Sequence, residues 1–407
     1  MLLSAYACTP NAGSEPGVGF ETLRAIALDH NVWVMTRRKN VEPLERYFRL
    51  HSTKGTVHIA GLDLSSKATR LKKRLGPLGM HWYYDRWQEL ARSRMEELSE
   101  SVRFDLVHHI TFATDWAKAG VAGSEVPFVW GPIGGGVNAP ARLISSLGAA
   151  GVVNEISRTV GRALMRRRSW YRAAWQSAEV VLVQNNETAS LARREVRIMV
   201  LSNGTALLTD PPGSQGRRNT EILVVGRLIP WKGGGLALQT LKRLGRSDVS
   251  LHFLGAGPDK RRLQKAAAHL EVAERVHFEG ELPRKVVLER ISRAGALLHP
   301  ALHEESSVTV GEALSLGTPV VCLDHGGPRE LLRRWPDSPA EAVPATDVKE
   351  TSRSLADALD RLMKQNHPVL TECLRPSPSF AEGIAEAYAL TARGAPASDG
   401  DSGFIEG

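Results

Sequence analysis

The chain has 407 residues, 42% of them hydrophobic and 24% charged, with a formal net charge of +8 and a pI near 9.5. This composition is typical of a globular protein with two α/β domains and excludes a disordered chain. Three widely spaced cysteines exclude a disulfide framework and a cysteine-based zinc site. The excess of basic residues favours anionic partners, such as nucleotides or an acidic membrane surface.

Strand and helix signals alternate along the first half of the chain. Strands are predicted for the apolar runs at residues 2–7, 31–35, 56–60, 104–110, 126–130 and 179–184. With helices between them, these runs predict a parallel sheet covered on both faces, which binds ligands beyond the carboxyl ends of its strands. We see no signal-peptide features and no apolar run of the roughly 18 residues that a spanning helix needs, so we expect a cytoplasmic protein.

Several polar or glycine-rich segments follow these strands. The turn from Gly13 to Gly19 precedes a predicted helix at 20–28, and its amides are candidates for binding phosphate or sugar, although a structural tight turn fits equally well. His108 and His109 end a strand, where only one of the two side chains can face a cleft, and a packed core histidine is the alternative. Further candidates for acceptor or sugar binding are Asp115, Gly134, Gly135 and Asn203.

Two segments, at 67–87 and 158–175, combine basic and aromatic residues. A basic amphipathic helix with tryptophans is typical of contact with an anionic membrane surface. The alternative is a solvated basic face above core aromatics, and each segment alone favours it. Because two such segments occur in one half of the chain, we expect peripheral contact with the inner membrane face.

The composition changes around 209–220, where proline, glycine and charge mark a linker. A second doubly wound domain follows, with strands predicted at 221–226, 249–254, 275–279, 296–300 and 319–323. A capping box at Ser379 and Glu382 opens a last helix from Phe380 to about Ala392. The predicted organisation is therefore an N-terminal domain at 1–208, a C-terminal domain at 209–378, a helix at 379–393 and a disordered tail at 394–407.

Positive charge is concentrated after the first strand of the second domain. Gly226 allows a tight exit from that strand, and Arg227 and Lys232 lie beyond its end, followed by glycines at 233–235. An arginine fork and a lysine point charge together can neutralise a diphosphate without a metal. Gly255 lies in a second turn of this kind, with a weaker signal.

A loop, a helix and a strand follow near the end of this domain. Ser306 or Ser307 can cap a helix at 308–316, and the amides at its start form an anion site. Glu304 and Glu312 frame this unit and are expected to accept hydrogen bonds from hydroxyls, which favours a nucleotide or nucleotide sugar. The alternative is that both glutamates are solvated surface residues.

At this point the chain resembles the family 4 glycosyltransferases, retaining enzymes of the two-domain GT-B fold. The most specific motifs are GRLIPWKGG at 226–234, HEESSVTVGEAL at 303–314 and GTPVV at 317–321. AYACTPNAGSEPGVG at 5–19 and PFVWGPIGGG at 127–136 are similar to a bacterial subgroup associated with exopolysaccharide and cell-envelope glycans. The resemblance covers nearly the whole chain.

The resemblance implies a role for individual residues. Arg227 and Lys232 would hold the donor diphosphate, Glu304 would bind the donor sugar, and Glu312 would bind the ribose. The helix 379–393 would return to the first domain. The family often has His-x-His where this chain has His108, His109 and Ile110, with His109 as the catalytic candidate. Further donor contacts are implied for Gly17, Gly19, Gly226, Gly255, Ser307, Val308 and Thr309.

The expected activity is front-side transfer with retention, from a UDP- or GDP-linked sugar to a hydroxyl of a glycan or lipid-linked acceptor. The one Asp-x-Asp, Asp399 and Asp401, lies in the predicted tail, so we expect no metal and no other cofactor. A nucleotide-sugar epimerase or phosphorylase of similar fold, or a non-catalytic nucleotide-sugar-binding protein, is the alternative. A nucleic-acid partner is disfavoured because the charge is not gathered on a reading module.

Overall fold

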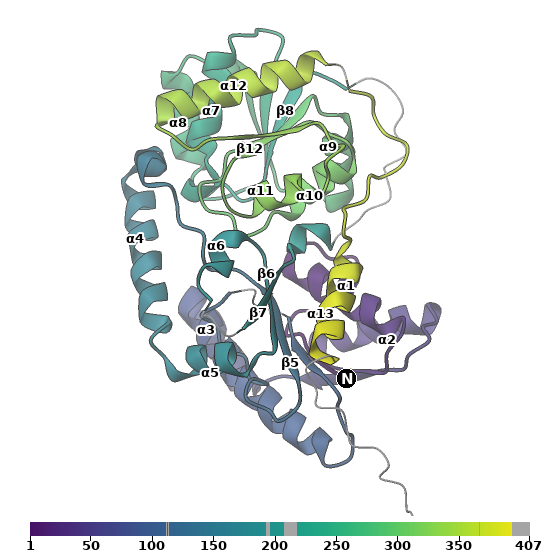
Figure 1. Cartoon of the computed structure of the whole chain (residues 1–407). Helices are drawn as coiled ribbons and strands as arrows, with labels where there is room; N and C mark the ends of the chain where they lie inside the picture. The colour runs from purple at the N-terminus through teal and green to yellow at the C-terminus, as the bar shows by residue number, and fades with distance from the viewer. Residues whose placement is uncertain (111, 113, 193–195, 207–217, 366, 393–407) are drawn as a thin grey trace, which may run out of the picture.

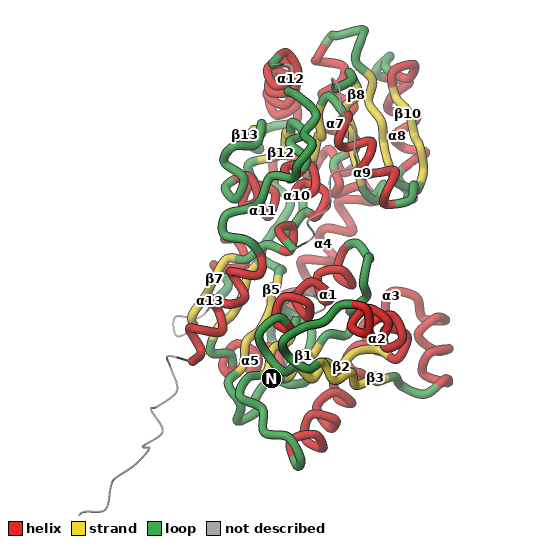
Figure 2. Tube along the Cα trace, turned by 90° about the vertical axis from the view of Figure 1, so that its right-hand side faces the viewer, coloured by secondary structure: helices red, strands yellow, loops and turns green. Residues whose placement is uncertain are grey.

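The computed structural model describes residues 1–110, 112, 114–192, 196–206, 218–365 and 367–392. Two domains, each built around one parallel sheet, lie one above the other (Figures 1 and 2). The predicted architecture of two doubly wound α/β domains is therefore confirmed. Among the described helices, none is both long and apolar enough to cross a bilayer.

The N-terminal domain has a seven-stranded sheet in which every strand pairing is parallel. Its strand order is β3 (Val57–Leu62), β2 (Val32–Arg37), β1 (Leu2–Ser4), β4 (Val107–His109), β5 (Phe128–Ile133), β6 (Val180–Val183) and β7 (Arg197–Val200). The sequence analysis missed β7, because this edge strand has only four residues and follows a charged segment. Six strands lie where apolar runs predicted them.

Helices cover both faces of this sheet. They are α1 (Ser14–Ala27), α2 (Val41–Leu50), α3 (Ser66–Ser99), α4 (Gly148–Met165), α5 (Ser169–Ser177) and α6 (Asn186–Ala189). Helix α3 is kinked at Gly76, whose φ of 57° and ψ of −131° are not helical. The helix predicted at 20–28 starts earlier than expected, because Pro16 is tolerated in the first turn of α1.

The C-terminal domain has a six-stranded parallel sheet with five strands at their predicted places. The order is β10 (Val276–Gly280), β9 (Ser250–Leu254), β8 (Glu221–Val225), β11 (Ala296–His299), β12 (Val320–Leu323) and β13 (Ala340–Val343). The sequence analysis missed β13, whose alanines and glutamate have low strand propensity. The helices are α7 (Gly234–Leu244), α8 (Lys260–His269), α9 (Arg284–Arg293), α10 (Val308–Ser315), α11 (Gly326–Leu332) and α12 (Val348–Lys364).

Helix α13 (Phe380–Ala392) packs on the N-terminal domain, far from α12 that precedes it in sequence (Figure 1). Its residues Phe380, Ile384 and Ala387 are buried in the same core cluster as α1 and the central strands of that domain. The predicted capping box is confirmed: Ser379 N donates to Glu382 Oε2 at 2.7 Å, and Glu382 N donates to Ser379 Oγ at 3.3 Å.

A second contact between the domains is an arm formed by the 3-10 helix η2 (Ala141–Leu147) and the start of α4. Leu143 and Leu147 are fully or almost fully buried within the core cluster of the C-terminal domain. Helix α4 then runs along one side of the molecule back to the N-terminal domain (Figure 1). The arm was not predicted, since its apolar residues carry no signal for which domain they contact.

The expected linker at 209–220, with the domain boundary at 208, lies mostly outside the described residues, as does the expected tail at 394–407. The described end of the linker belongs to the C-terminal domain. The Arg218 guanidinium donates to the carbonyls of Ser292 at 2.6 Å and Gly317 at 2.8 Å.

Candidate active site

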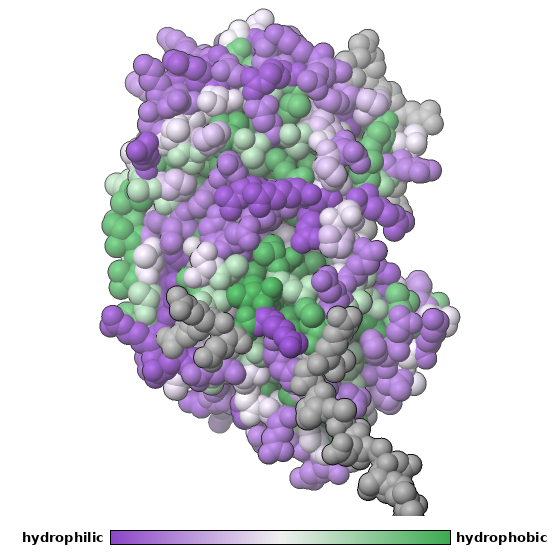
Figure 3. All heavy atoms as spheres, viewed as in Figure 1, coloured by the Kyte–Doolittle hydropathy of each residue, from purple (hydrophilic) through white to green (hydrophobic). Residues whose placement is uncertain are grey.

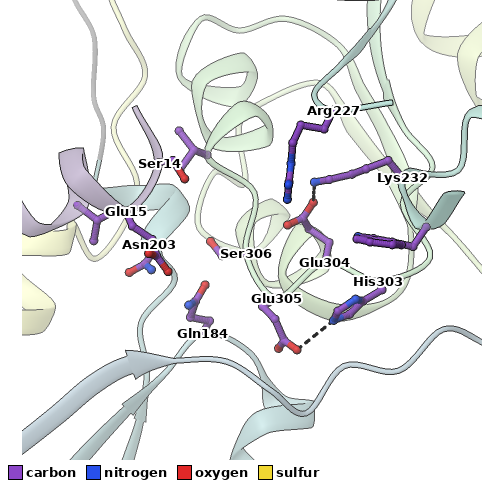
Figure 4. Close-up of a pocket in the computed structure, with 13 residues that line it drawn as sticks. Ser14, Glu15, Gln184, Asn203, Arg227, Lys232, His303, Glu304, Glu305 and Ser306 are labelled. Carbon is purple, nitrogen blue, oxygen red and sulfur yellow. Dashed lines mark hydrogen bonds and ion pairs between the residues drawn. The ribbon is translucent and has the colours of Figure 1, made fainter. Parts of the chain in front are cut away.

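A cavity of about 260 Å³ lies between the two domains, where the carboxyl ends of both sheets face one another (Figure 4). The N-terminal domain contributes the start of α1, the loop residue Gln184 after β6 and the first residue of the 3-10 helix η3 (Asn203–Thr205). The C-terminal domain contributes the loop after β8 and the segment between β11 and α10. The residues that line the cavity are Ser14, Glu15, Val18, Gln184, Asn203, Arg227, Trp231, Lys232, His303, Glu304, Glu305, Ser306 and Val308.

Arg227 lines this cavity, and its side chain is exposed. Gly226, which precedes it, has a φ of 134°, a conformation that favours glycine, and this turn carries the chain out of β8. Within the described part of the chain, the Arg227 side chain has no hydrogen bond or ion pair. An exposed, unpaired guanidinium that faces a cavity is available to bind an anion in a bidentate manner.

Lys232 and Glu304 form an ion pair in the same cavity (Figure 4). Lys232 ends the 3-10 helix η4 (Pro230–Lys232), and Glu304 Oε2 also lies 3.3 Å from His299 Nε2. Burial opposes ionisation of Glu304, but Lys232 and His299 outweigh it and lower the pKa of Glu304 to about 2. The carboxylate therefore stays charged and fixes the direction of the lysine.

Helix α10 starts at the cavity. Ser307 caps it, since its Oγ accepts a hydrogen bond from Val310 N at 3.3 Å, which decides between the two predicted caps. Val308 lines the cavity, whereas Thr309 and Glu312 do not. Glu312 is instead buried and paired with Arg284 at 2.5 Å, and burial raises its pKa against the opposing effect of that arginine.

The first turns of α1 take the place of the expected glycine turn. Gly17 and Gly19 are buried inside the helix, and Ser14, Glu15 and Val18 face the cavity instead. A Cβ atom at Gly19 would lie 2.1 Å from the Ala7 carbonyl oxygen, so glycine is needed for close packing of the helix rather than for a flexible cradle. The expected turn is therefore a helix N-terminus.

The two histidines at the end of β4 lie in the interior of the N-terminal domain, and neither lines the cavity. His109 hydrogen-bonds with the Tyr84 hydroxyl at 3.0 Å and with Ser4 Oγ at 3.1 Å. His108 Nε2 donates to the Gly131 carbonyl at 2.7 Å, so His108 Nδ1 accepts from the Tyr388 hydroxyl at 2.8 Å. The expectation that one histidine faces the cleft is not met, because each side chain is fixed by buried partners.

We expect His108 to weaken the fold in mild acid. Burial lowers the pKa of His108 to about 4, whereas an unfolded histidine titrates near 6.5. Between these values only the unfolded chain binds the proton, so stability falls by about 1.4 kcal/mol per pH unit as the pH is lowered. Denaturant unfolding from pH 7 to pH 5 should show wild type losing stability relative to His108→Gln, and parallel curves would contradict this assignment.

A glycine loop after β5 supports the cavity from the N-terminal domain. Asp115 is fully buried; its amide donates to the Gly134 carbonyl at 2.7 Å, and its carboxylate accepts from Arg166 Nε at 2.7 Å. Burial raises the pKa of Asp115 against the opposing effect of Arg166. A Cβ atom at Gly135 would lie 1.9 Å from Asp115 Oδ1, so a side chain does not fit there. Asp115 thus shapes the loop and does not line the cavity.

Of the two remaining predicted residues, Asn203 lines the cavity and Gly255 does not. The buried Oδ1 of Asn203 has no hydrogen-bond partner among the described residues, so it is available to a ligand. Gly255 lies behind the loop after β8, where a Cβ atom would lie 2.1 Å from the Gly226 carbonyl oxygen. Its φ of 147° is a conformation that favours glycine, so the backbone geometry explains this residue without a ligand contact.

Glu305 is the main residue that the sequence analysis missed. Its carboxylate accepts hydrogen bonds from Asn185 Nδ2 at 3.0 Å, Thr188 Oγ1 at 3.2 Å and Val137 N at 3.3 Å, all in the N-terminal domain. Burial opposes its ionisation, but His303 and the Gly135 amide help to lower its pKa. Glu305 therefore links the two domains through hydrogen bonds, next to Glu304 in the sequence. The only sequence signal for this role was its position beside the candidate Glu304.

Two arginines and most of the large rings of the basic and aromatic segments have contacts inside the protein. Arg162 and Arg166 donate to the Gly135 carbonyl, each at 2.6 Å, so they hold the glycine loop. Five large aromatic rings of the two segments are buried in the core of the N-terminal domain, as the alternative of core aromatics under a basic face predicted. These rings belong to Tyr83, Tyr84, Trp87, Tyr171 and Trp175.

Comparisons with known proteins agree with this fold. Residues 213–370 match the family model "Glycosyl transferases group 1". A trehalose-phosphate synthase structure from Burkholderia xenovorans superposes with a TM-score of 0.56 at 12% identity, over 96% of both chains. The fold is GT-B. The family match covers the segment with Arg227, Lys232 and Glu304, whereas the likeness of fold covers both domains.

The curated relatives match a smaller part of the chain. A 2-deoxystreptamine glucosyltransferase of Streptomyces kanamyceticus is 29% identical over 150 residues, 36% of this chain and 37% of that protein. A GDP-mannose-dependent alpha-mannosyltransferase of Mycolicibacterium smegmatis is 35% identical over 109 residues, 26% of each chain. The chain thus spans well under half the length of these two relatives.

Proposed function

We propose that the chain is a retaining, metal-independent glycosyltransferase of family 4, which moves a sugar from a UDP- or GDP-linked donor to a hydroxyl acceptor. The observation that carries this proposal is the Arg227 guanidinium, without a partner among the described residues, beside the Lys232–Glu304 pair in a cavity between the two domains. The names of the relatives, a glucosyltransferase and a mannosyltransferase, support transfer of a hexose. The proposed acceptor is a lipid-linked saccharide or envelope glycan, with peripheral contact between enzyme and membrane.

The chemistry follows from where charge develops. As the bond between the sugar and the diphosphate breaks, negative charge grows on the leaving phosphate oxygen, and Arg227, Lys232 and the amides at the start of α10 stabilise it. The acceptor hydroxyl attacks from the same face, and its proton passes to that oxygen. Arg227 binds two phosphate oxygens, while Lys232 is held in place by Glu304. The step needs no protein nucleophile.

Calorimetric titration with UDP, GDP and ADP in the presence of a chelator tests the donor site. We expect one of these nucleotides to bind, and Arg227→Ala to weaken its binding roughly 10–100-fold, because charged hydrogen bonds to phosphate are lost. Arg261→Ala is a matched control, since Arg261 is exposed on α8 and does not line the cavity. Equal affinity in both variants, or no binding by wild type, would refute the site.

Turnover separates the proposed activity from its alternatives. With the matching donor and a hydroxyl acceptor, NMR of the product should show the anomeric configuration of the donor retained, with the same rate in chelator. Isomerised donor without acceptor would indicate an epimerase. A donor that binds and is never consumed would indicate a non-catalytic binding protein.

A further inference from the structure

Helix α4 carries an apolar stripe that no described residue covers. Val153, Ile156, Val160 and Leu164 are 62%, 60%, 53% and 54% exposed, and their spacing of three and four residues places them on one face of the helix. Figure 3 shows apolar side chains along the left edge of the molecule, where Figure 1 places α4. Single exposed apolar residues are common, but a contiguous stripe of this kind marks an interaction surface.

The opposite face of α4 explains why the stripe points outward. Arg162 is buried against the glycine loop, Glu155 accepts from the Ala139 amide at 3.2 Å, and Arg158 contacts His303 at 2.9 Å. These polar contacts at the domain interface fix the rotation of the helix. The apolar stripe therefore faces solvent and packs against neither domain.

The charge around the stripe identifies its partner. The segment 141–177 contains seven arginines and one acidic residue, Glu155, which is buried. Four of these arginines are exposed, one before the stripe in the sequence and three after it. They are Arg142, Arg167, Arg168 and Arg172. An apolar stripe flanked by arginines is complementary to a surface of acyl chains under anionic headgroups.

A second copy of the chain fits this surface less well. Two α4 helices packed by their stripes would bring exposed arginines of both copies together, and the segment 141–177 offers no exposed carboxylate to pair with them. We propose that α4 lies in the plane of an anionic lipid bilayer, with Val153, Ile156, Val160 and Leu164 below the headgroups. This inference deepens the peripheral contact proposed above, and its test does not depend on catalysis.

Vesicle sedimentation of the full chain tests the proposal. Wild type should bind vesicles of phosphatidylcholine mixed with phosphatidylglycerol, and bind vesicles of phosphatidylcholine alone far more weakly. Ile156→Ser/Val160→Ser should lower the partition coefficient at least about ten-fold, since buried methylene groups are lost. Arg167→Ser/Arg168→Ser should lower it roughly five-fold per arginine, and added salt should remove this difference.

The matched control is Leu28→Ser/Leu50→Ser, which removes two apolar side chains that are 47% and 73% exposed elsewhere on the N-terminal domain. Thermal unfolding should show each variant folded, because surface substitutions change stability little. Binding that is absent in wild type, or equal in the stripe and control variants, overturns the proposal. So does a wild-type dimer in sedimentation velocity that the stripe variant converts to monomer.

The nucleotide titration keeps the two proposals separate. The stripe variant should bind the nucleotide as tightly as wild type does, because the stripe lies on the outer face of α4. A chain that binds anionic vesicles through the stripe and binds no nucleotide would refute the proposed donor site alone. A chain that binds the nucleotide and ignores the vesicles would refute the α4 surface alone.

Discussion

Replacing Lys232 with alanine is expected to lower kcat roughly 10²–10³-fold, the effect of removing one preorganised group that stabilises developing charge. Lys232 Nζ is paired with Glu304 in the interdomain cavity, so its charge is already aimed where the leaving diphosphate would lie. Initial rates with the donor found by titration measure this effect. Lys232→Arg should recover only part of the activity, because a planar fork does not replace a point charge.

The control for this experiment is Lys242→Ala, which removes a partly exposed lysine paired with Glu271 on the surface. It should keep wild-type kcat. Circular dichroism of Lys232→Ala should match wild type, which separates loss of function from loss of fold. If Lys232→Ala keeps activity within about three-fold of wild type, the assignment of the diphosphate site is wrong.

Glu305→Ala is expected to reduce the free energy of unfolding by about 2–4 kcal/mol, the cost of leaving several buried donors without their acceptor. Asn185, Thr188 and the Val137 amide all donate to this carboxylate from the other domain. Loss of these hydrogen bonds should also let the two domains unfold in separate transitions. Denaturant unfolding followed by fluorescence measures both effects.

Glu271→Ala is the matched control for Glu305, because the Glu271 side chain is 82% exposed and pairs with Lys242. Its effect should stay below about 0.5 kcal/mol. A similar small effect for Glu305→Ala would mean that the contacts of Glu305 contribute little, and that the η2 arm and other pairs such as Arg329 and Glu187 hold the domains together.

Local sequence signals predicted the features that depend on neighbouring residues. The Ser307 cap, the capping box of Ser379 and Glu382, and the strands of two parallel sheets follow from patterns a few residues long. The grouping of Arg227, Lys232 and Glu304 followed from strand ends in one sheet, since these ends share an edge. What each of these residues binds stays a prediction.

The remaining features depend on contacts between distant segments, which local patterns do not encode. The sequence left open which side chain of the pair His108 and His109 faces a cleft, and buried partners such as Tyr388 turned both inward. In the sequence Glu305 has the features of a solvated glutamate, because its partners, such as the Val137 amide, belong to the other domain. For the aromatic rings of 67–87 and 158–175 the sequence allowed either a membrane surface or the core, and most of these rings are buried because large rings bury much apolar area.

The return of α13 to the N-terminal domain has a consequence for how the protein is made. The ribosome completes every strand of the first sheet by Val200, but the core around α1 keeps an open place until Phe380, Ile384 and Ala387 emerge. At about 5–20 residues per second, this interval is on the order of ten to thirty seconds. During that time the whole C-terminal domain is synthesised while its partner has an uncovered apolar face, so the first domain to be translated is the last to be finished.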